Sequence, residues 1–255
     1  MKKSEPQFFV KQYGLKIFAV CFWLLFWEIM SRIIGQDIFL PSPFNVVITL
    51  FGLVQSIGFW QTILFSFTRI VLGFFLAILV GTVLSVLSFR SLILKELVMP
   101  LMKVIKATPV ASFIILALIW IKARNLSVLI SFLMVVPMIY TTVGQGLAAA
   151  DEKLLQMAEV FRIGRLKKIR AIYIPAVIPH FISAISVGLG FCWKAGIAAE
   201  VIGFPPGSIG GQLYEAKLFL MTKELFAWTT VIIIISILFE KIVMWFIQLL
   251  QHDAG

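Results

Sequence analysis

Charged residues are scarce in this chain. Asp, Glu, Lys and Arg make up 13% of its 255 residues, about half the share of an ordinary soluble domain, and 61% of the residues are hydrophobic. Four long stretches contain no charged residue: 38–68, 70–89, 125–150 and 171–193. A helix of roughly 20 apolar residues crosses a bilayer, and lipid does not tolerate unpaired backbone. The composition therefore argues against a soluble protein and predicts an integral membrane protein.

Cysteine and histidine are also scarce, with two residues of each. Cys21 and Cys192 both fall inside predicted spans, where we expect small buried residues and neither a disulfide nor a metal site. The chain contains no His-Glu-x-x-His and no Gly-x-Ser-x-Gly. Asp37, Asp151 and Asp253 lie outside the middle of every span. These absences argue against an intramembrane enzyme.

The apolar runs predict an all-α, polytopic membrane protein with about six transmembrane helices, forming a single membrane domain over 1–255. The predicted spans are 16–35, 62–88, 97–121, 125–147, 176–202 and 225–250. The first apolar run is too long for a signal peptide and lacks a small-residue cleavage site, so we expect a retained helix. The run Leu40-Pro41-Ser42-Pro43 ends that helix, and 44–59 is expected to form a short helix at the outer surface.

Basic residues are divided unequally between the segments that connect these spans. With the N-terminus in the cytoplasm, the inner set is Lys2, Lys3, Lys11, Lys16, Arg90, Lys95, Lys103, Lys106, Lys153, Arg162, Arg165, Lys167, Lys168 and Arg170. The outer set is Arg32, Lys122, Arg124, Lys217 and Lys223. Because cytoplasmic loops carry an excess of Lys and Arg, both termini are predicted to be cytoplasmic.

Two predicted spans carry a small residue at every fourth position. These residues are Gly73, Ala77, Gly81 and Ser85 in 62–88, and Ala184, Gly188, Cys192 and Gly196 in 176–202. Small-residue ridges let helix backbones approach closely in lipid. They indicate either general helix packing or a surface that lines the substrate pathway or a subunit interface.

Three of the charged residues within the predicted spans are candidate pathway residues. Arg69 and Glu200 lie near the outer ends of their spans and are expected to pair, whereas Lys194 lies deeper without an obvious partner. Charges at membrane depth are costly and are usually paired or functional. They could form a structural ion-pair network, or a gate or anion-attracting pathway.

The segment 151–175, between the fourth and fifth predicted spans, carries the most informative pattern. Asp151 can cap a helix start, Gly164 suits a helix end, and Pro175 opens the next span. An apolar face is formed by Leu154, Met157, Ala158 and Phe161, and a basic piece by Arg165, Lys167, Lys168 and Arg170. We predict an amphipathic helix, a glycine turn and a basic helix. Either a partner protein or an anionic membrane surface would cover the apolar face.

This segment resembles the cytoplasmic loop of ABC importer permeases. That loop follows the pattern Glu-Ala-Ala, three residues, Gly, nine residues, Ile, one residue, Leu-Pro. The run from Gln156 to Pro175 aligns without a gap, with matches at Ala158, Ile172 and Pro175. Gln156 replaces Glu and Arg162 replaces Gly, and Gly164 could serve the same turn.

Further stretches resemble one branch of this family, which includes nitrate, sulfonate and taurine permeases and permeases for thiamine-precursor pyrimidines. They are Leu40-Pro41-Ser42-Pro43, Ser66 to Phe74, and the run from Gly188 to Trp193 through Ala199-Glu200. The resemblance implies a type I ABC importer transmembrane domain with a permease core at about 59–248. It also implies a homodimer in the bacterial cytoplasmic (inner) membrane. A solute-binding protein would deliver a small polar or anionic solute, such as a sulfonate, taurine, nitrate or a pyrimidine.

The resemblance further implies that the loop docks on a separate ATPase dimer. The implied coupling residues are Leu154, Gln156, Met157, Ala158, Glu159, Phe161, Arg162, Gly164, Arg165, Ile172 and Pro175. The chain has no Gly-Lys pair and therefore no P-loop, so ATP and Mg would bind to that partner. We expect no cofactor or metal in this chain, no enzymatic activity of its own and no nucleic-acid partner.

Two questions stay open at this point. A secondary transporter or channel is the alternative function, although the sequence shows no paired broken spans and no internal repeat. The run Gly203 to Gly211 could be a simple connection between the last two spans, or a surface that receives the solute-binding protein.

Overall fold

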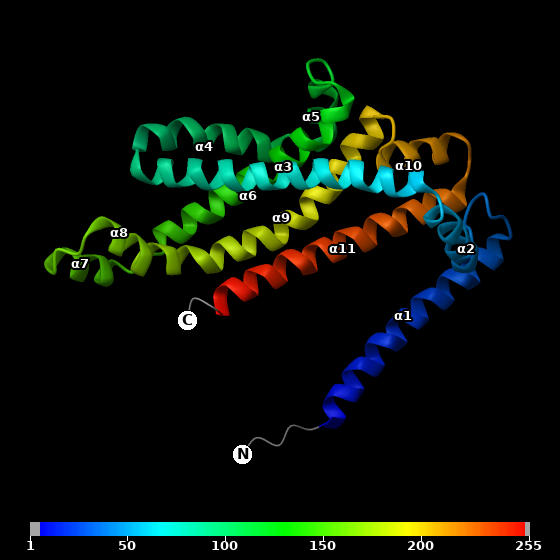
Figure 1. Ribbon diagram of the computed structural model, residues 1–255, viewed down its shortest axis with the longest axis horizontal. Helices are drawn as coiled ribbons and strands as arrows, with labels where there is room; N and C mark the ends of the chain where they lie inside the picture. Colours follow the sequence, from blue (N-terminus) through cyan, green and yellow to red (C-terminus); the bar gives the residue numbers. More distant parts are fainter. Residues whose placement is uncertain (1–5, 253–255) are drawn as a thin grey trace. The chain divides into compact units, whose positions relative to one another are not determined.

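The computed structural model describes residues 6–252, and the side chains of residues 14–249. Lys2, Lys3 and Asp253, and the side chain of Lys11, lie outside the described residues. Every regular element within that range is a helix (Figure 1). The helices are α1 (Pro6–Ile34), α2 (Pro43–Val54), α3 (Ile57–Arg90), α4 (Leu92–Ala107), α5 (Val110–Ala117), α6 (Ala123–Ala148), α7 (Glu152–Val160), α8 (Arg165–Lys168), η1 (Ile169–Tyr173), α9 (Ile174–Gly203), α10 (Ile209–Leu218) and α11 (Thr222–His252).

Five helical segments of the described chain are long and apolar enough to cross a membrane: Gly14–Ile34, Ile57–Arg90, Ala123–Ala148, Arg165–Gly203 and Thr222–Leu249. A sixth span is obtained if α4 and α5 are taken as one broken pair, bent by 104°. The prediction of an all-α protein with about six spans is confirmed. The prediction of one unbroken helix over 97–121 is wrong. Pro109 offers no backbone N–H and forces Thr108 into an extended conformation with ψ of 130°, which ends α4 there.

The chain forms two compact units, of which the first comprises Met1–Phe59 and Gln212–Val231. Within it, the indole N–H of Trp27 donates to the carbonyl of Pro41 at 3.1 Å, and Ser42 caps α2 ahead of Pro43. Lys223 forms an ion pair with Asp37 at 2.8 Å, and this hydrogen bond lowers the pKa of the Asp37 carboxyl. The predicted helix after the first span is confirmed, although it is shorter than 44–59.

The second unit comprises Trp60–Gly211 and Ile232–Gly255, and its centre is the pairing of α6 with α9. The small-residue ridges pack here. A Cβ atom on Gly81 of α3 would lie 2.9 Å from the Cβ of Ile139, and one on Gly196 of α9 would lie 2.6 Å from Ser131 Oγ. Both of these partners belong to α6. At these glycines the ridges therefore serve helix packing inside one chain, the first of the two interpretations.

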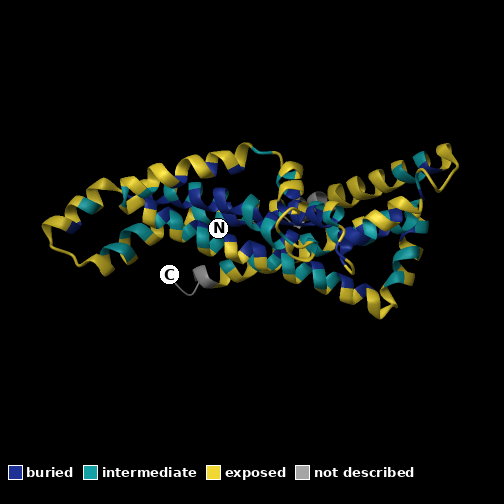
Figure 2. Cartoon of the chain, turned by 90° about the horizontal axis from the view of Figure 1, so that it is seen from above, coloured by how far each residue is buried: buried dark blue, intermediate teal, exposed yellow. Residues whose placement is uncertain are grey.

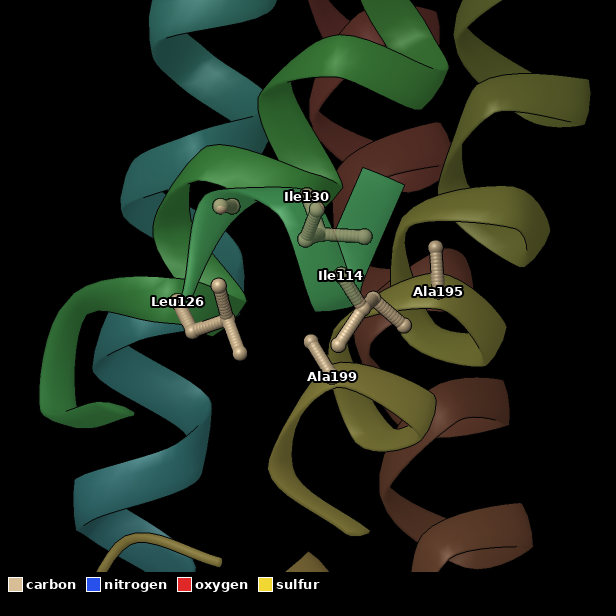
Figure 3. Packing of buried hydrophobic residues seen from close by; sticks show 6 residues of the cluster. Ile114, Leu126, Ile130, Ala195 and Ala199 are labelled. Atoms are coloured by element: carbon tan, nitrogen blue, oxygen red, sulfur yellow. The ribbon is translucent and has the colours of Figure 1, made fainter. Parts of the chain in front are cut away.

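Helix α5 fits into the groove between α6 and α9. Ile114 of α5 is fully buried against Leu126 and Ile130 of α6 and against Ala195 and Ala199 of α9 (Figure 3). The two alanines leave room for the larger side chains of α5 and α6. This packing holds α5 in its bent position relative to α4.

Candidate functional site

The segment 151–175 forms a helical hairpin that projects from the second unit. Asp151 accepts a hydrogen bond from the backbone N–H of Lys153 at 2.8 Å and so caps α7, as predicted. The basic piece is not a separate helix, because α8, η1 and α9 form one apolar helical segment from Arg165 to Gly203. The predicted boundary at residue 176 is therefore too late. Pro175 fits inside this helix because the wider π turn of η1 precedes it.

The turn of the hairpin depends on Arg162. Its φ of 50° lies in the left-handed region, and the N–H of Ile163 returns to the carbonyl of Ala158 at 2.8 Å. Gly164 has φ of −60° and ψ of 150°, and a Cβ atom added there would meet no other atom within 4 Å. The expectation that Gly164 makes the turn is wrong. Arg162 occupies the place of the family's glycine, and its backbone conformation is one that glycine adopts more readily than any other residue.

The apolar face of α7 is divided between the inside and the outside of the hairpin. Ala158 is 1% exposed, so it packs within its own chain. Leu154, Met157 and Phe161 are 41%, 48% and 72% exposed. Figure 2 shows the hairpin, at the left of the view, as mostly exposed. The interpretation of Ala158 as a surface contact is therefore wrong, whereas the other three side chains remain available to a partner.

The other predicted coupling residues surround this exposed face. Gln156, Glu159, Arg165 and Pro175 are exposed, and Ile172 is half-buried. Glu159 forms an ion pair across the hairpin with Lys168 at 3.7 Å. A hollow of about 660 Å³ lies on the hairpin and is lined by residues of both arms. The hairpin thus offers an exposed apolar edge beside a basic arm.

The predicted pair of Arg69 and Glu200 is not a direct salt bridge in the described part of the chain. Arg69 Nε donates to the carbonyl of Arg124 at 2.6 Å, and its guanidinium stacks 3.8 Å from the ring centre of Phe65. Only a longer-range attraction joins Arg69 to Glu200. The prediction failed because matched depth places two residues at one level and does not make their side chains face each other.

Glu200 is fully buried and organises the start of α10. Its Oε2 accepts from Ser66 Oγ at 2.7 Å and from the N–H of Gly210 at 3.2 Å, and Ser66 Oγ accepts from the N–H of Ile209 at 2.9 Å. Ser208 Oγ accepts from the N–H of Gly211 at 2.9 Å. Free N–H groups at a helix start attract a carboxylate. The carboxylate thus ties α3 and α9 to the start of α10.

This network was not predicted from the sequence, in which Gly203 to Gly211 was interpreted only as a connection or a docking surface. The turn at Phe204 to Ser208 is present, but α10 begins at Ile209. Gly210 is the one available signal, because a Cβ atom there would collide with the Cβ of Glu200. A buried acid and a distant glycine cannot be matched without the fold.

Lys194 lies on the exposed face of α9, within the membrane-spanning part of the helix. Val187 and Phe191 lie on the same face and are 47% and 50% exposed. None of the described acidic residues forms an ion pair with Lys194. An ammonium group in this position requires water or protein around it, because lipid does not solvate it.

Comparison with known proteins agrees with this arrangement. Residues 69–254 match the family described as binding-protein-dependent transport system inner membrane component. The chain belongs to this family. It is therefore a multi-pass permease subunit of the inner membrane in an ABC importer. Transport by this family depends on a binding protein, and ATP is hydrolysed by a separate subunit.

Several curated relatives place the permease in the predicted branch. The taurine transport system permease protein TauC of Escherichia coli K12 is 25% identical, over 85% of this chain and 80% of the relative. The putative aliphatic sulfonates transport permease protein SsuC of Bacillus subtilis 168 is 24% identical, over 94% and 85%. The nitrate import permease protein NrtB of Synechococcus elongatus PCC 7942 is 28% identical, over 78% and 75%.

The left-handed turn gives a prediction for the hairpin. Changing Arg162 to Gly should relieve about 1 kcal/mol of backbone strain, slowing hydrogen exchange of the Ile163 amide about five-fold. Arg162→Val should accelerate exchange, because a β-branched side chain fits this conformation poorly. Gly164→Ala is the control and should leave exchange unchanged. If Gly164→Ala accelerated exchange as much as Arg162→Val, the turn would be assigned wrongly.

The buried carboxylate gives a second prediction. Ser66→Ala removes a donor to the buried Glu200, and Glu200→Gln replaces a charge-assisted acceptor with a neutral amide. Each change should therefore destabilise the permease by about 1–3 kcal/mol. The double change should cost less than the sum, with coupling of about 1 kcal/mol. Arg69→Ala combined with Glu200→Gln should be closer to additive. Thermal unfolding in detergent measures the stability of each variant. Additive effects of the Ser66 and Glu200 changes would contradict the network.

Proposed function

We propose that this permease moves a small anionic solute across the inner membrane, through a pathway that exposes Lys194. Sulfonate, taurine, nitrate and pyrimidine-like solutes were the candidates from sequence. The relatives are named for taurine, aliphatic sulfonates, nitrate and bicarbonate, and each of these solutes carries an anionic group. The observation that carries the proposal is the exposed ammonium of Lys194 on a membrane-spanning helix.

A cation on this face of α9 favours a polar pathway. An unpaired Lys in hydrocarbon costs about 3 kcal/mol or more, so the face would not be left to lipid. A second copy of the permease would supply the other wall, which supports a homodimer. The pathway-forming core comprises residues of about 59–248. At its outer end, Arg69 and Glu200 connect neighbouring segments through their hydrogen bonds.

The orientation of the permease follows from its basic residues. Both termini are proposed to be cytoplasmic, which places the hairpin 151–175 on the same side. There its exposed side chains, Leu154, Met157 and Phe161, would pack against the ATPase dimer. Val160 extends the same edge and is 78% exposed. An exposed apolar edge on a polar, basic hairpin indicates a protein partner.

The coupling role is tested by changing the exposed edge and leaving the buried Ala158 intact. Phe161→Asp should weaken copurification of the ATPase about 30-fold. In the proposed complex the Phe161 ring is buried against the ATPase, and the variant places an unpaired carboxylate there. Phe219→Asp is the matched control. Phe219 is 68% exposed and lies between α10 and α11, on the opposite side of the membrane in the proposed orientation.

Each other outcome has a distinct meaning. If only Phe219→Asp lost the ATPase, the proposed orientation would be contradicted and the reverse orientation supported. If Phe161→Asp kept its ATPase but released the hairpin from the membrane surface, the hairpin would be a lipid-binding element. ATP-independent uptake in all variants would support a channel or secondary transporter.

The anion pathway is tested at Lys194. Lys194→Gln should lower uptake of the transported anion about ten-fold or more, because a charge-assisted contact is lost. Lys194→Arg should retain most of the uptake, since it keeps the charge. Expression and ATPase copurification should be normal in both variants. Uptake would be measured in proteoliposomes with taurine, nitrate and bicarbonate, and unchanged uptake by Lys194→Gln would contradict the proposal.

A further inference from the structure

The second unit contains a cavity that neither the hairpin nor Lys194 accounts for. Its volume is about 610 Å³, and it lies where the ends of α3 and α6 meet the α8–η1–α9 segment. The walls are apolar and include Val86, Val143, Val177 and Phe181. The ring of Phe89 meets that of Tyr173 edge to face, with 5.9 Å between the centres. This volume is in the range of pockets that hold small ligands.

Basic side chains line the cavity at one end. They are Arg90 at the end of α3, and Arg165 and Lys168 in α8. No acidic residue of the described chain lines the cavity. Glu159 reaches Lys168 at 3.7 Å but is 78% exposed, and neither arginine has an ion-pair partner among the described residues. The cavity therefore combines a positively charged end with an apolar interior.

The depth of the cavity matches one leaflet of a membrane. On α3 its lining runs from Arg90 to Thr82, a rise of about 12 Å along the helix. One leaflet contributes about 15 Å of hydrocarbon. The opposite wall uses the wide turn of η1, whose Ile169 and Tyr173 both line the cavity. A π turn at such a place is often functional.

We propose that this cavity binds an anionic phospholipid, with its phosphate on Arg90, Arg165 and Lys168 and an acyl chain against the apolar walls. Basic pockets between membrane helices bind anionic headgroups in this way. A soluble anion would leave the apolar interior empty. That the lipid belongs to the cytoplasmic leaflet rests on the orientation proposed above. Arg165 and Lys168 also belong to the hairpin, so the bound lipid would steady the basic arm that stands beside the coupling edge.

The test uses the permease purified with its ATPase, stripped of lipid and titrated with phosphatidylglycerol. Arg90→Gln with Lys168→Gln should weaken binding about 25-fold, since each basic residue contributes about five-fold. Lys95→Gln with Lys103→Gln is the matched control. It removes the same charge from exposed positions of α4 outside the cavity and should bind normally. Val86→Trp fills the apolar end without changing the charge and should also weaken binding.

Two comparison ligands, and a measurement of whether lipid reaches the cavity in the assembled dimer, complete the test. Phosphatidylcholine should bind much more weakly, and inorganic phosphate should not compete. Equal binding by all variants, effective competition by phosphate, or a cavity closed to lipid in the assembled dimer would each overturn the proposal. Thermal unfolding confirms that each variant is folded. If the permease bound the lipid but did not copurify with its ATPase, the coupling role proposed for the hairpin would be contradicted and the lipid site would still be supported.

Discussion

The close approach of α3 and α9 to α6 is the contact on which the rest of the second unit depends. Apolar side chains gain little from leaving lipid, so helices in a membrane associate through packing and hydrogen bonds. Gly81 and Gly196 meet α6 with no room for a side chain, and Ser131 Oγ donates to the carbonyl of Cys192 at 3.0 Å. Because these backbones are fixed at short distance, the side chains around them have defined partners.

Two features of the candidate site follow from this packing. At one end, Ser66 of α3 and Glu200 of α9 are held together and cap α10. Along the same helix, Trp193 is buried against Phe67 and Phe239, so its neighbour Lys194 must face outward. A residue next to a buried tryptophan on a helix points about 100° away from it. Helix α9 therefore packs in the core on one face and exposes the ammonium of Lys194 on another, within its membrane-spanning part.

The hairpin is shaped by local backbone chemistry and not by its apolar face alone. Ala158 turns inward and accepts from Ile163, and Arg162 takes the left-handed conformation that reverses the chain. The larger side chains, Leu154, Met157 and Phe161, are consequently left outside. The basic arm continues directly into α9. A force on the hairpin would thus pass into the helix that carries both Lys194 and Glu200, without a flexible joint.

The sequence by itself determined the membrane class, about six spans, the position and cap of the hairpin and membership of the ABC permease family. These depend on composition, on periodicity and on short runs such as Asp151 with the helix behind it. It did not determine the break at Pro109, the left-handed Arg162, the inward Ala158 or the partners of Glu200 and Arg69. Helical period places residues on a face, but only packing decides what that face meets. The partners of Glu200 lie 134 and 10 residues away, and only the folded chain brings them together.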